Sequence, residues 1–277
     1  MICGILIFKK KIKKKLVIGF ISCCFSHIIS GDFVSKRLKF FLSHLSLSIF
    51  IALIVLGLVF LIWYPFPLAQ AIGVTDIFLM LLAIDVVIGP MLGWVVYKEG
   101  KKTLKMDLSI IILLQLAALL YGIYSIGQGR PVWLAYNVDR FEVIRNNEVI
   151  EDNISQALSQ YQQVSWLRPQ LVGVEFARDA SIRSDDMFVE VLGGISIAQK
   201  PERYVPMAEV KHQIQQRAQN LELLKQFNDQ QSVQKILAKY PQADAFVPLK
   251  ATAVDMTVLI NKEKGEVVKI VDLRPWK

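Results

Sequence analysis

The residues LSLSIFIALIVLGLVFLIW, from Leu45 to Trp63, form an apolar run that contains no charged side chain. A helix needs about 20 apolar residues to cross the hydrocarbon core of a bilayer, because every main-chain polar group must find its partner within the segment. Two further runs meet this requirement, IFLMLLAIDVVIGPMLGWVVY at residues 77–97 and LSIIILLQLAALLYGIYSI at residues 108–126. The sequence therefore predicts three N-terminal transmembrane α-helices at about residues 45–63, 77–97 and 108–126, with a lipid bilayer as their partner.

The segments that flank these runs differ in charge. Residues 64–76, YPFPLAQAIGVTD, contain no Lys or Arg, whereas residues 98–107, KEGKKTLKMD, contain four Lys. Basic loops stay in the cytoplasm. The N-terminus, which carries Lys36, Arg37 and Lys39 before the first run, and the second loop are therefore predicted to be cytoplasmic. The first loop and everything after Ile126 are predicted to lie outside.

Aromatic side chains lie near the ends of the runs, as in the aromatic belts of membrane proteins. They are Trp63, Tyr64, Trp94, Tyr97, Tyr121 and Tyr124. The formal net charge of +8 resides mainly in the basic clusters beside the apolar runs. A nucleic-acid interface would instead place its basic residues on a folded domain with interleaved aromatic side chains. We therefore predict no nucleic-acid partner.

Residues 1–33 form an N-terminal extension that fits this topology poorly. LVIGFISCCFSHIIS, residues 16–30, is short for a span, and a crossing there would place Lys36 and Lys39 outside, against the charge rule. Two explanations remain open. The extension is either an interfacial segment or a mis-assigned start, with Val34 as the true first residue. The poor fit favours the second explanation.

Polar and small residues interrupt the apolar runs. Asp85 lies in the middle of the second run, and Gly89, Pro90 and Gly93 follow it. Asp85, Gly89 and Gly93 share one side of a helix because they are spaced four apart. A carboxyl group in a membrane is costly and faces a partner or a cavity. The candidate roles are a proton relay, a contact with a partner helix, or a neutral Asp85 hydrogen-bonded near Gln115 of the third run.

Residues 128–277 read as one C-terminal domain, and residues 34–127 as the transmembrane region. β-Branched and aromatic residues predict strands in 132–144 and 171–177, and apolar spacing predicts helices at 181–192, 207–227 and 232–240. The segments 253–260 and 266–273 flank NKEKG, which predicts a hairpin with Gly265 at a position of positive φ. We expect an α+β domain with a small antiparallel sheet.

The domain offers little chemistry. Its sequence has no Cys, since Cys3, Cys23 and Cys24 all precede it, and its one His, His212, lies on a Gln-rich helix where we expect it to be solvated. Motifs such as HExxH and CxxC are absent. We therefore predict no catalytic residue, no cofactor and no metal site.

Several stretches resemble one family. These are DVVIGPMLGWVVYKEGKKTLKMDLSIIILLQLAALLYGIY at residues 85–124, GRPV at 129–132, VDRFEV at 138–143, VPL at 247–249, DMTV at 255–258, GEVV at 265–268 and DLRPW at 272–276. They resemble the TfpX/TfpZ family of type IV pilin accessory proteins, also called FimB-like, over residues 35–277. The resemblance implies a bacterial inner-membrane protein with a periplasmic domain that helps a cognate pilin reach the pilus. It implies no catalytic residue.

This resemblance suggests partners and one rival function. The expected partner is the type IV major pilin, and the pilus assembly platform is a second candidate. The stripe of Asp85, Gly89 and Gly93 could dock the pilin helix or pack the chain's own helices. The rival function is an envelope enzyme acting on pilin or cell-surface glycan, for which the candidate carboxylates are Asp139, Glu142, Asp255 and Asp272.

Overall fold

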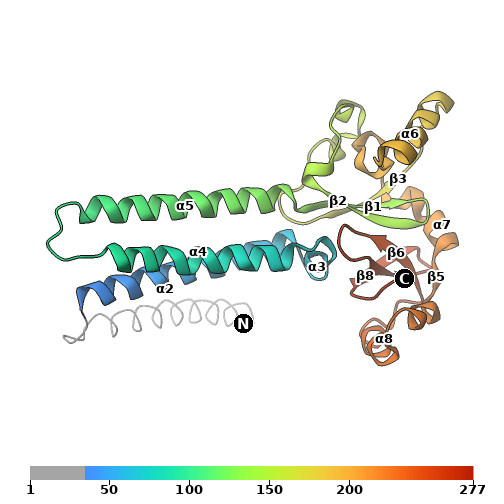
Figure 1. Cartoon of the computed structure of the whole chain (residues 1–277). Helices are drawn as coiled ribbons and strands as arrows, with labels where there is room; N and C mark the ends of the chain where they lie inside the picture. Colours follow the sequence, from blue (N-terminus) through green and yellow to red (C-terminus); the bar gives the residue numbers. More distant parts are fainter. Residues whose placement is uncertain (1–34, 277) are drawn as a thin grey trace, which may run out of the picture. The chain divides into compact units, whose positions relative to one another are not determined.

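The structure is a computed structural model in which residues 35–276 are described (Figure 1). The N-terminal extension, residues 1–33, lies outside the described residues. The chain divides into two compact units. Unit 1 holds the residues up to Ala52 together with Leu82–Leu119, and unit 2 holds Leu53–Leu81 together with Leu120–Lys277.

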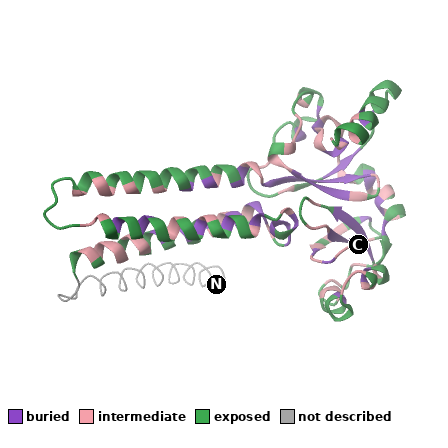
Figure 2. Cartoon of the chain, viewed as in Figure 1, coloured by how far each residue is buried: buried purple, intermediate pink, exposed green. Residues whose placement is uncertain are grey.

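Three helices have the length and apolar composition needed to cross a membrane, at residues 36–63, 74–96 and 104–128. They are α2 (Lys36–Gly57) with its π-helical continuation η1 (Leu58–Trp63), α4 (Val74–Val96) and α5 (Leu104–Gln128). Each contains most or all of one predicted run. The first begins at Lys36 rather than Leu45, because the preceding basic residues are themselves good helix formers. Exposed residues are in the majority along α4 and α5, whereas α2 consists mainly of intermediate and exposed residues (Figure 2).

A short helix, α3 (Leu68–Ile72), lies between η1 and α4 in unit 2. Leu68 is 2% exposed and Ala71 is fully buried, although the sequence reads as a simple loop. The main-chain N–H groups of Ala253 and Val254 both donate to the carbonyl oxygen of Ala71, at 2.9 and 3.1 Å. The connection between the first two long helices is therefore an integral part of unit 2.

The strands of unit 2 form one sheet, which has eight strands among the described residues. The order is β4-β3-β1-β2-β6-β7-β8, and β5 pairs with β6. The bounds are β1 Pro131–Asn137, β2 Arg140–Arg145, β3 Gln170–Val174, β4 Tyr204–Val205, β5 Gln219–Asn220, β6 Ala245–Lys250, β7 Met256–Asn261 and β8 Glu266–Val271.

The prediction of a small antiparallel sheet was wrong, because the sheet is mixed. β1 pairs with β3 in parallel, and β2 pairs with β6 in parallel at Phe141–Leu249 and Glu142–Lys250. Parallel neighbours need long crossover connections. Residues 138–169 supply one and residues 146–244 supply the other. Such pairs are separated widely in sequence and leave no local turn signal, so only the antiparallel hairpins could be predicted.

The local predictions in this domain fared better. The C-terminal hairpin is confirmed, since β7 and β8 pair antiparallel and Gly265 has a φ of 62°. Helix α6 (Ala180–Gly193) is confirmed as well, and α8 (Gln230–Leu237) falls inside the expected range apart from its first two residues. The helix predicted over 207–227 was too long. α7 (Met207–Arg217) ends where β5 leaves to pair with β6, and a 3₁₀ helix, η7 (Leu221–Gln226), follows.

Short 3₁₀ turns fill the long connections of the domain. They are η2 (Asn146–Glu148), η3 (Ile154–Gln156), η4 (Ser159–Tyr161), η5 (Ile197–Gln199) and η6 (Pro201–Arg203). Three apolar clusters hold unit 2 together. The largest joins α3 and α7 to the sheet through Leu68, Ala71, Ile214, Val247 and Val258. A second is aromatic, with Trp133 edge-on to Tyr161 and Tyr204.

Candidate functional site

Within unit 1, Gln115 of α5 gathers polar groups from three helices. Its Nε2 donates to the main-chain oxygen of Asp85 on α4 at 3.0 Å and to Ser48 Oγ on α2 at 3.1 Å. Its Oε1 lies 2.9 Å from His44 Nε2. Since an amide oxygen only accepts, His44 is the donor in this contact. The structure thus brings Asp85 and Gln115 together, but through the carbonyl of Asp85 and not its carboxyl group.

The small residues of the predicted stripe make room for these contacts. A Cβ on Gly89 would overlap Gln115 Oε1, and a Cβ on Gly93 would lie 2.8 Å from Phe40 Cε1. Gly89, Pro90 and Gly93 are all buried. Close approach of helices at glycine is typical of packing in membranes. Gly89 and Gly93 therefore face other helices of the chain itself.

A cavity of about 80 Å³ borders this polar cluster. Water needs polar partners and a volume of about one probe sphere, so the cavity is large enough for a few water molecules. Asp85 borders it beside His44, Ser48 and Gln115, and apolar side chains form the rest of the wall: Leu47, Ile51, Ala52, Leu82, Ile112, Leu116 and Leu119. The arrangement can hold α2, α4 and α5 in one register by hydrogen bonds between the helices.

Sequence reasoning missed His44 and Ser48 as members of this cluster. Ser48 is 7% exposed, and the Nδ1 atom of His44 is buried without a hydrogen-bond partner among the described residues. The two residues are four apart, so they lie on one helix face. That spacing, inside an otherwise apolar run, is the signal that could have identified them.

In unit 2, the ends of the long helices are fixed by aromatic residues. Tyr64, which is 1% exposed, donates its hydroxyl to the carbonyl oxygen of Ile126 at 2.7 Å. Burial raises the pKa of Tyr64 well above its ordinary value, so the phenol remains a neutral donor. Trp63 is 7% exposed and packs against Gly127. These two residues are therefore turned into the protein and do not form the aromatic belt predicted for them.

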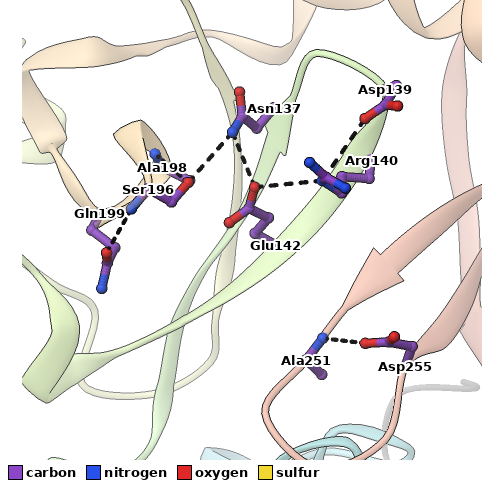
Figure 3. A network of polar contacts seen from close by, with 9 residues as sticks. All are labelled: Asn137, Asp139, Arg140, Glu142, Ser196, Ala198, Gln199, Ala251 and Asp255. Atoms are coloured by element: carbon purple, nitrogen blue, oxygen red, sulfur yellow. Dashed lines mark hydrogen bonds and ion pairs between the residues drawn. The ribbon is translucent and has the colours of Figure 1, made fainter. Parts of the chain in front are cut away.

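A polar network lies where β1 and β2 meet η5 (Figure 3). Glu142 is 6% exposed and accepts a hydrogen bond from Asn137 Nδ2 at 3.0 Å. Asn137 also contacts Ser196 Oγ at 3.4 Å, and Arg140 Nε lies 3.8 Å from both Glu142 and Asp139. A cavity of about 160 Å³ is lined by Glu142, Ser196 and other residues.

The other two candidate carboxylates have separate structural partners. Asp255 accepts hydrogen bonds from the Ala251 N–H at 2.9 Å and from Trp276 Nε1 at 2.7 Å. Asp272 forms an ion pair with Arg274, whose Nη1 also donates to the main-chain oxygen of Asp255. The four carboxylates thus belong to two sets with different partners. Over residues 35–276, no group of three or more His, Cys, Asp or Glu side chains is arranged to hold a metal ion.

Helix α6 buries a charged residue and leaves several of its large apolar residues exposed. Its polar Asp186 is 3% exposed and forms ion pairs with Lys200 at 2.6 Å and Arg203 at 2.9 Å. Burial alone would raise the pKa of Asp186, but hydrogen bonds from Lys200 and Arg203 hold it below its ordinary value. Asp179 caps the helix by accepting from the N–H groups of Ser181 and Ile182.

Most residues of α6 are exposed (Figure 2), and they include large apolar ones. Val191 is 80% exposed, and four further large apolar side chains on the helix are 48–69% exposed: Ile182, Met187, Phe188 and Leu192. A group of exposed apolar residues on one element marks an interaction surface. We call these five residues the α6 face.

Comparison with known proteins places the chain in a family. A model described as the fimbrial assembly protein FimB matches residues 32–73. The chain is 31% identical to the serogroup I fimbrial assembly protein of Dichelobacter nodosus over 180 residues, which are 64% of this chain and 70% of that protein. It is 30% identical to the serogroup E1 protein of the same organism over 201 residues, 72% of this chain and 75% of the other. This chain belongs to the FimB family. No solved structure matches it.

The resemblance stated from the sequence is thereby confirmed, and a role in pilus assembly comes with the FimB family. The segment that matches the FimB model contains α2, η1 and α3. It therefore includes His44 and Ser48 of the polar cluster, and Leu68 and Ala71 of the sheet core.

Proposed function

We propose that this FimB-family protein is a non-enzymatic accessory protein of the bacterial inner membrane that assists the assembly or stability of a cognate type IV pilin. The observation that carries the proposal is the α6 face, an exposed apolar surface on a protein whose relatives are named for fimbrial assembly. A protein that acts through contacts needs such a surface, whereas an enzyme needs converging chemical groups.

The proposed orientation rests on charge. The four Lys of residues 98–107 lie in the cytoplasm, and the Lys-free connection at residues 64–73 lies outside with the C-terminal domain. This places the α6 face in the periplasm, where a pilin has its globular head. A reporter fused after Trp276 tests the orientation, since a periplasmic reporter such as alkaline phosphatase should be active there. Activity only of a cytoplasmic reporter would contradict it.

The pilin contact lies on the α6 face, and the stripe of Asp85, Gly89 and Gly93 packs the chain's own helices. The contacts of Gly89 with Gln115 and of Gly93 with Phe40 support this division. A photo-crosslinker at Gly93 should capture only intramolecular partners, whereas one at Val191 should capture pilin. Capture of pilin by a crosslinker at Gly93 would contradict this division and would show that the stripe contacts the pilin helix.

Two charged substitutions test the role of the α6 face. Phe188→Asp and Val191→Asp should leave folding intact, because both side chains are exposed, and should abolish surface pili like a deletion of the gene. Asp185→Asn on the exposed side of the same helix is the matched control and should assemble pili normally. In each strain, surface pili are counted and the total amount of pilin is measured. Normal piliation in the deletion strain would refute the accessory function, and normal piliation in both charged variants would refute the surface.

The non-enzymatic part of the proposal is supported by the partners of three of the candidate carboxylates. Asp255 and Asp272 are held by Trp276 and Arg274, and Glu142 is held by Asn137. Glu142→Gln keeps the shape and the hydrogen bond but removes the charge. Piliation should survive this substitution. Loss of pili or of a pilin modification, with the protein still present at its normal level, would favour the envelope enzyme.

A further inference from the structure

The connection between η4 and β3, residues 162–169, holds two of the exposed large apolar side chains of unit 2. Trp166 is 73% exposed and Leu167 is 65% exposed. An isolated exposed apolar residue needs no explanation, but an exposed tryptophan that is held rigidly does. The contacts beneath Trp166 show that its exposure is built into the fold.

Arg130 supports the Trp166 side chain from below. Its guanidinium carbon lies 4.9 Å from the ring centroid, which is cation–π geometry. Arg130 is itself only 4% exposed, because it donates to the carbonyl oxygens of Gly127 at 2.7 Å and of Ser165 at 3.4 Å. The indole is therefore fixed with one side against a buried cation and the rest exposed.

Trp63 fixes the position of Trp166 relative to the end of the first long helix. The Nε1 of Trp63 donates to the main-chain oxygen of Trp166 at 3.0 Å, and Trp63 is the last residue of the first membrane-crossing helix. Trp166 and Leu167 consequently lie level with the end of a span, where acyl chains meet headgroups. Trp63 is turned inward, so Trp166 occupies the position in the aromatic belt that Trp63 leaves.

A shallow cavity of about 350 Å³ beside these residues has an ion-binding group in its wall. Its lining residues are Ile62, Ser165, Leu167, Arg168, Pro169 and Gln170. Ile62 belongs to the span, so whatever fills the cavity lies at membrane depth. A guanidinium suits a phosphate group because it offers paired donors. Arg168 is exposed at this depth, where phospholipid headgroups are found.

We propose that residues 162–169 form a membrane anchor, in which Trp166 and Leu167 enter the outer boundary of the bilayer and Arg168 contacts a phospholipid phosphate. This inference rests on the membrane placement in the proposed function. The anchor fixes the C-terminal domain against the bilayer surface at a point far in sequence from α4 and from the start of α5.

Quenching by brominated lipid tests the anchor. The full chain is reconstituted into vesicles of phosphatidylcholine and phosphatidylglycerol, with or without bromine near the glycerol end of the acyl chains. Trp166→Phe is the variant, and its fold should persist because Trp63 bonds only the main chain of Trp166. The emission of the unsubstituted chain minus that of Trp166→Phe is the emission of Trp166, which we call the Trp166 difference. We expect brominated lipid to reduce the Trp166 difference about twofold. Trp276→Phe is the control. The emission that this substitution removes should be the same with and without brominated lipid.

The outcomes separate this inference from the proposed function. If the remaining emission of Trp166→Phe is quenched by bromine but the Trp166 difference is not, the chain is in the membrane and the anchor is wrong. If neither is quenched, the membrane placement itself fails. A third outcome is that bromine does not quench Trp166 but purified pilin shifts the wavelength of its emission. This result would assign the surface to a protein partner and overturn the anchor.

A second variant keeps the test independent of the Trp166 substitution. Leu167→Asp retains all five tryptophans and places a charge at the proposed boundary. It should shift Trp166 emission to longer wavelength and weaken its quenching by brominated lipid, because a carboxylate is excluded from the acyl region. Unchanged quenching in Leu167→Asp would also overturn the anchor.

Discussion

The long helices are held together differently in the two units of the molecule. In unit 2, the connection between η1 and α4 is apolar, contains no Lys and packs Leu68 and Ala71 into the sheet core. In unit 1, the connection between α4 and α5 is exposed and contains four Lys over residues 98–107. The helices of unit 1 contact one another through polar side chains around Gln115. Burial of apolar surface holds the first connection, whereas the second unit adds hydrogen bonds between helices to their packing.

The strongest test of this contrast removes the α3 anchor. Leu68→Ala deletes a side chain that is 2% exposed in the core and should lower the free energy of unfolding by about 2–5 kcal/mol. Gln70→Ala on the same helix is the matched control, since Gln70 is exposed, and should change stability by at most about 0.5 kcal/mol. Thermal unfolding of the full chain in detergent measures both. Equal stability of the two variants would show that α3 does not contribute to the core.

The polar cluster of unit 1 is tested at Gly89. Gly89→Ala introduces a Cβ that overlaps Gln115 Oε1, so Gln115 must move and lose its bonds to Asp85 and Ser48. We expect a loss of about 1–3 kcal/mol. Gly57→Ala is the control, because a Cβ there has nothing within 4 Å and alanine favours the helix. Both are measured by unfolding in detergent.

Coupling to Gln115 shows whether the loss at Gly89 has the proposed origin. In the background of Gln115→Ala, the Gly89→Ala change should cost much less, because the overlapping atom is gone. Full additivity of the two changes would place the strain elsewhere.

A smaller effect is expected at the helix ends of unit 2. Tyr64→Phe removes the hydrogen bond to the carbonyl oxygen of Ile126 but keeps the ring, so it should cost about 0.5–1.5 kcal/mol. Tyr121→Phe is the matched control, since Tyr121 is 73% exposed, and should be neutral. Differential scanning calorimetry of the two variants can resolve them. A neutral Tyr64→Phe would mean that burial of the ring alone fastens this end.

The smallest effect is expected in the Lys-rich connection of unit 1. Lys101 pairs with Asp107 at 2.6 Å, but the side chains are 41% and 22% exposed. Lys101→Ala should therefore change stability very little, and even that small change should vanish at high salt. Unfolding is compared at low and high ionic strength. A large loss that persists in salt would show that this connection is also a structural anchor.

The features that local sequence determines were predictable. The apolar runs identify the three long helices, and Gly265 with its flanking β-branched residues identifies the C-terminal hairpin. The parallel pairs of the sheet were not predictable, because strands such as β2 and β6 are joined by long crossovers that carry no local signal. α7 was predicted too long for the same reason, since Gln219 and Asn220 pair with distant strand residues.

The candidate site was predicted in part. Asp85, Gly89 and Gln115 could be singled out because polar or small residues are conspicuous in an apolar run. Their partners were not, since the face of α2 that meets α5 is defined only by packing, and this face supplies His44 and Ser48. The α6 face was hidden because the usual rule, that apolar residues of a helix are buried, is reversed by the buried ion pairs of Asp186.

The seating of α3 sets a condition on how the newly made chain can fold. Leu68 and Ala71 leave the ribosome long before β6 and β7, the strands whose residues enclose them. During synthesis these apolar side chains have no sheet to pack against. With the long helices across a bilayer, as proposed above, the sheet can close its hydrophobic centre only if these side chains lie on the same side of the membrane as its strands. Correct insertion of the first two helices is thus a prerequisite for a folded C-terminal domain, and a wrongly inserted chain would present an open core to proteases.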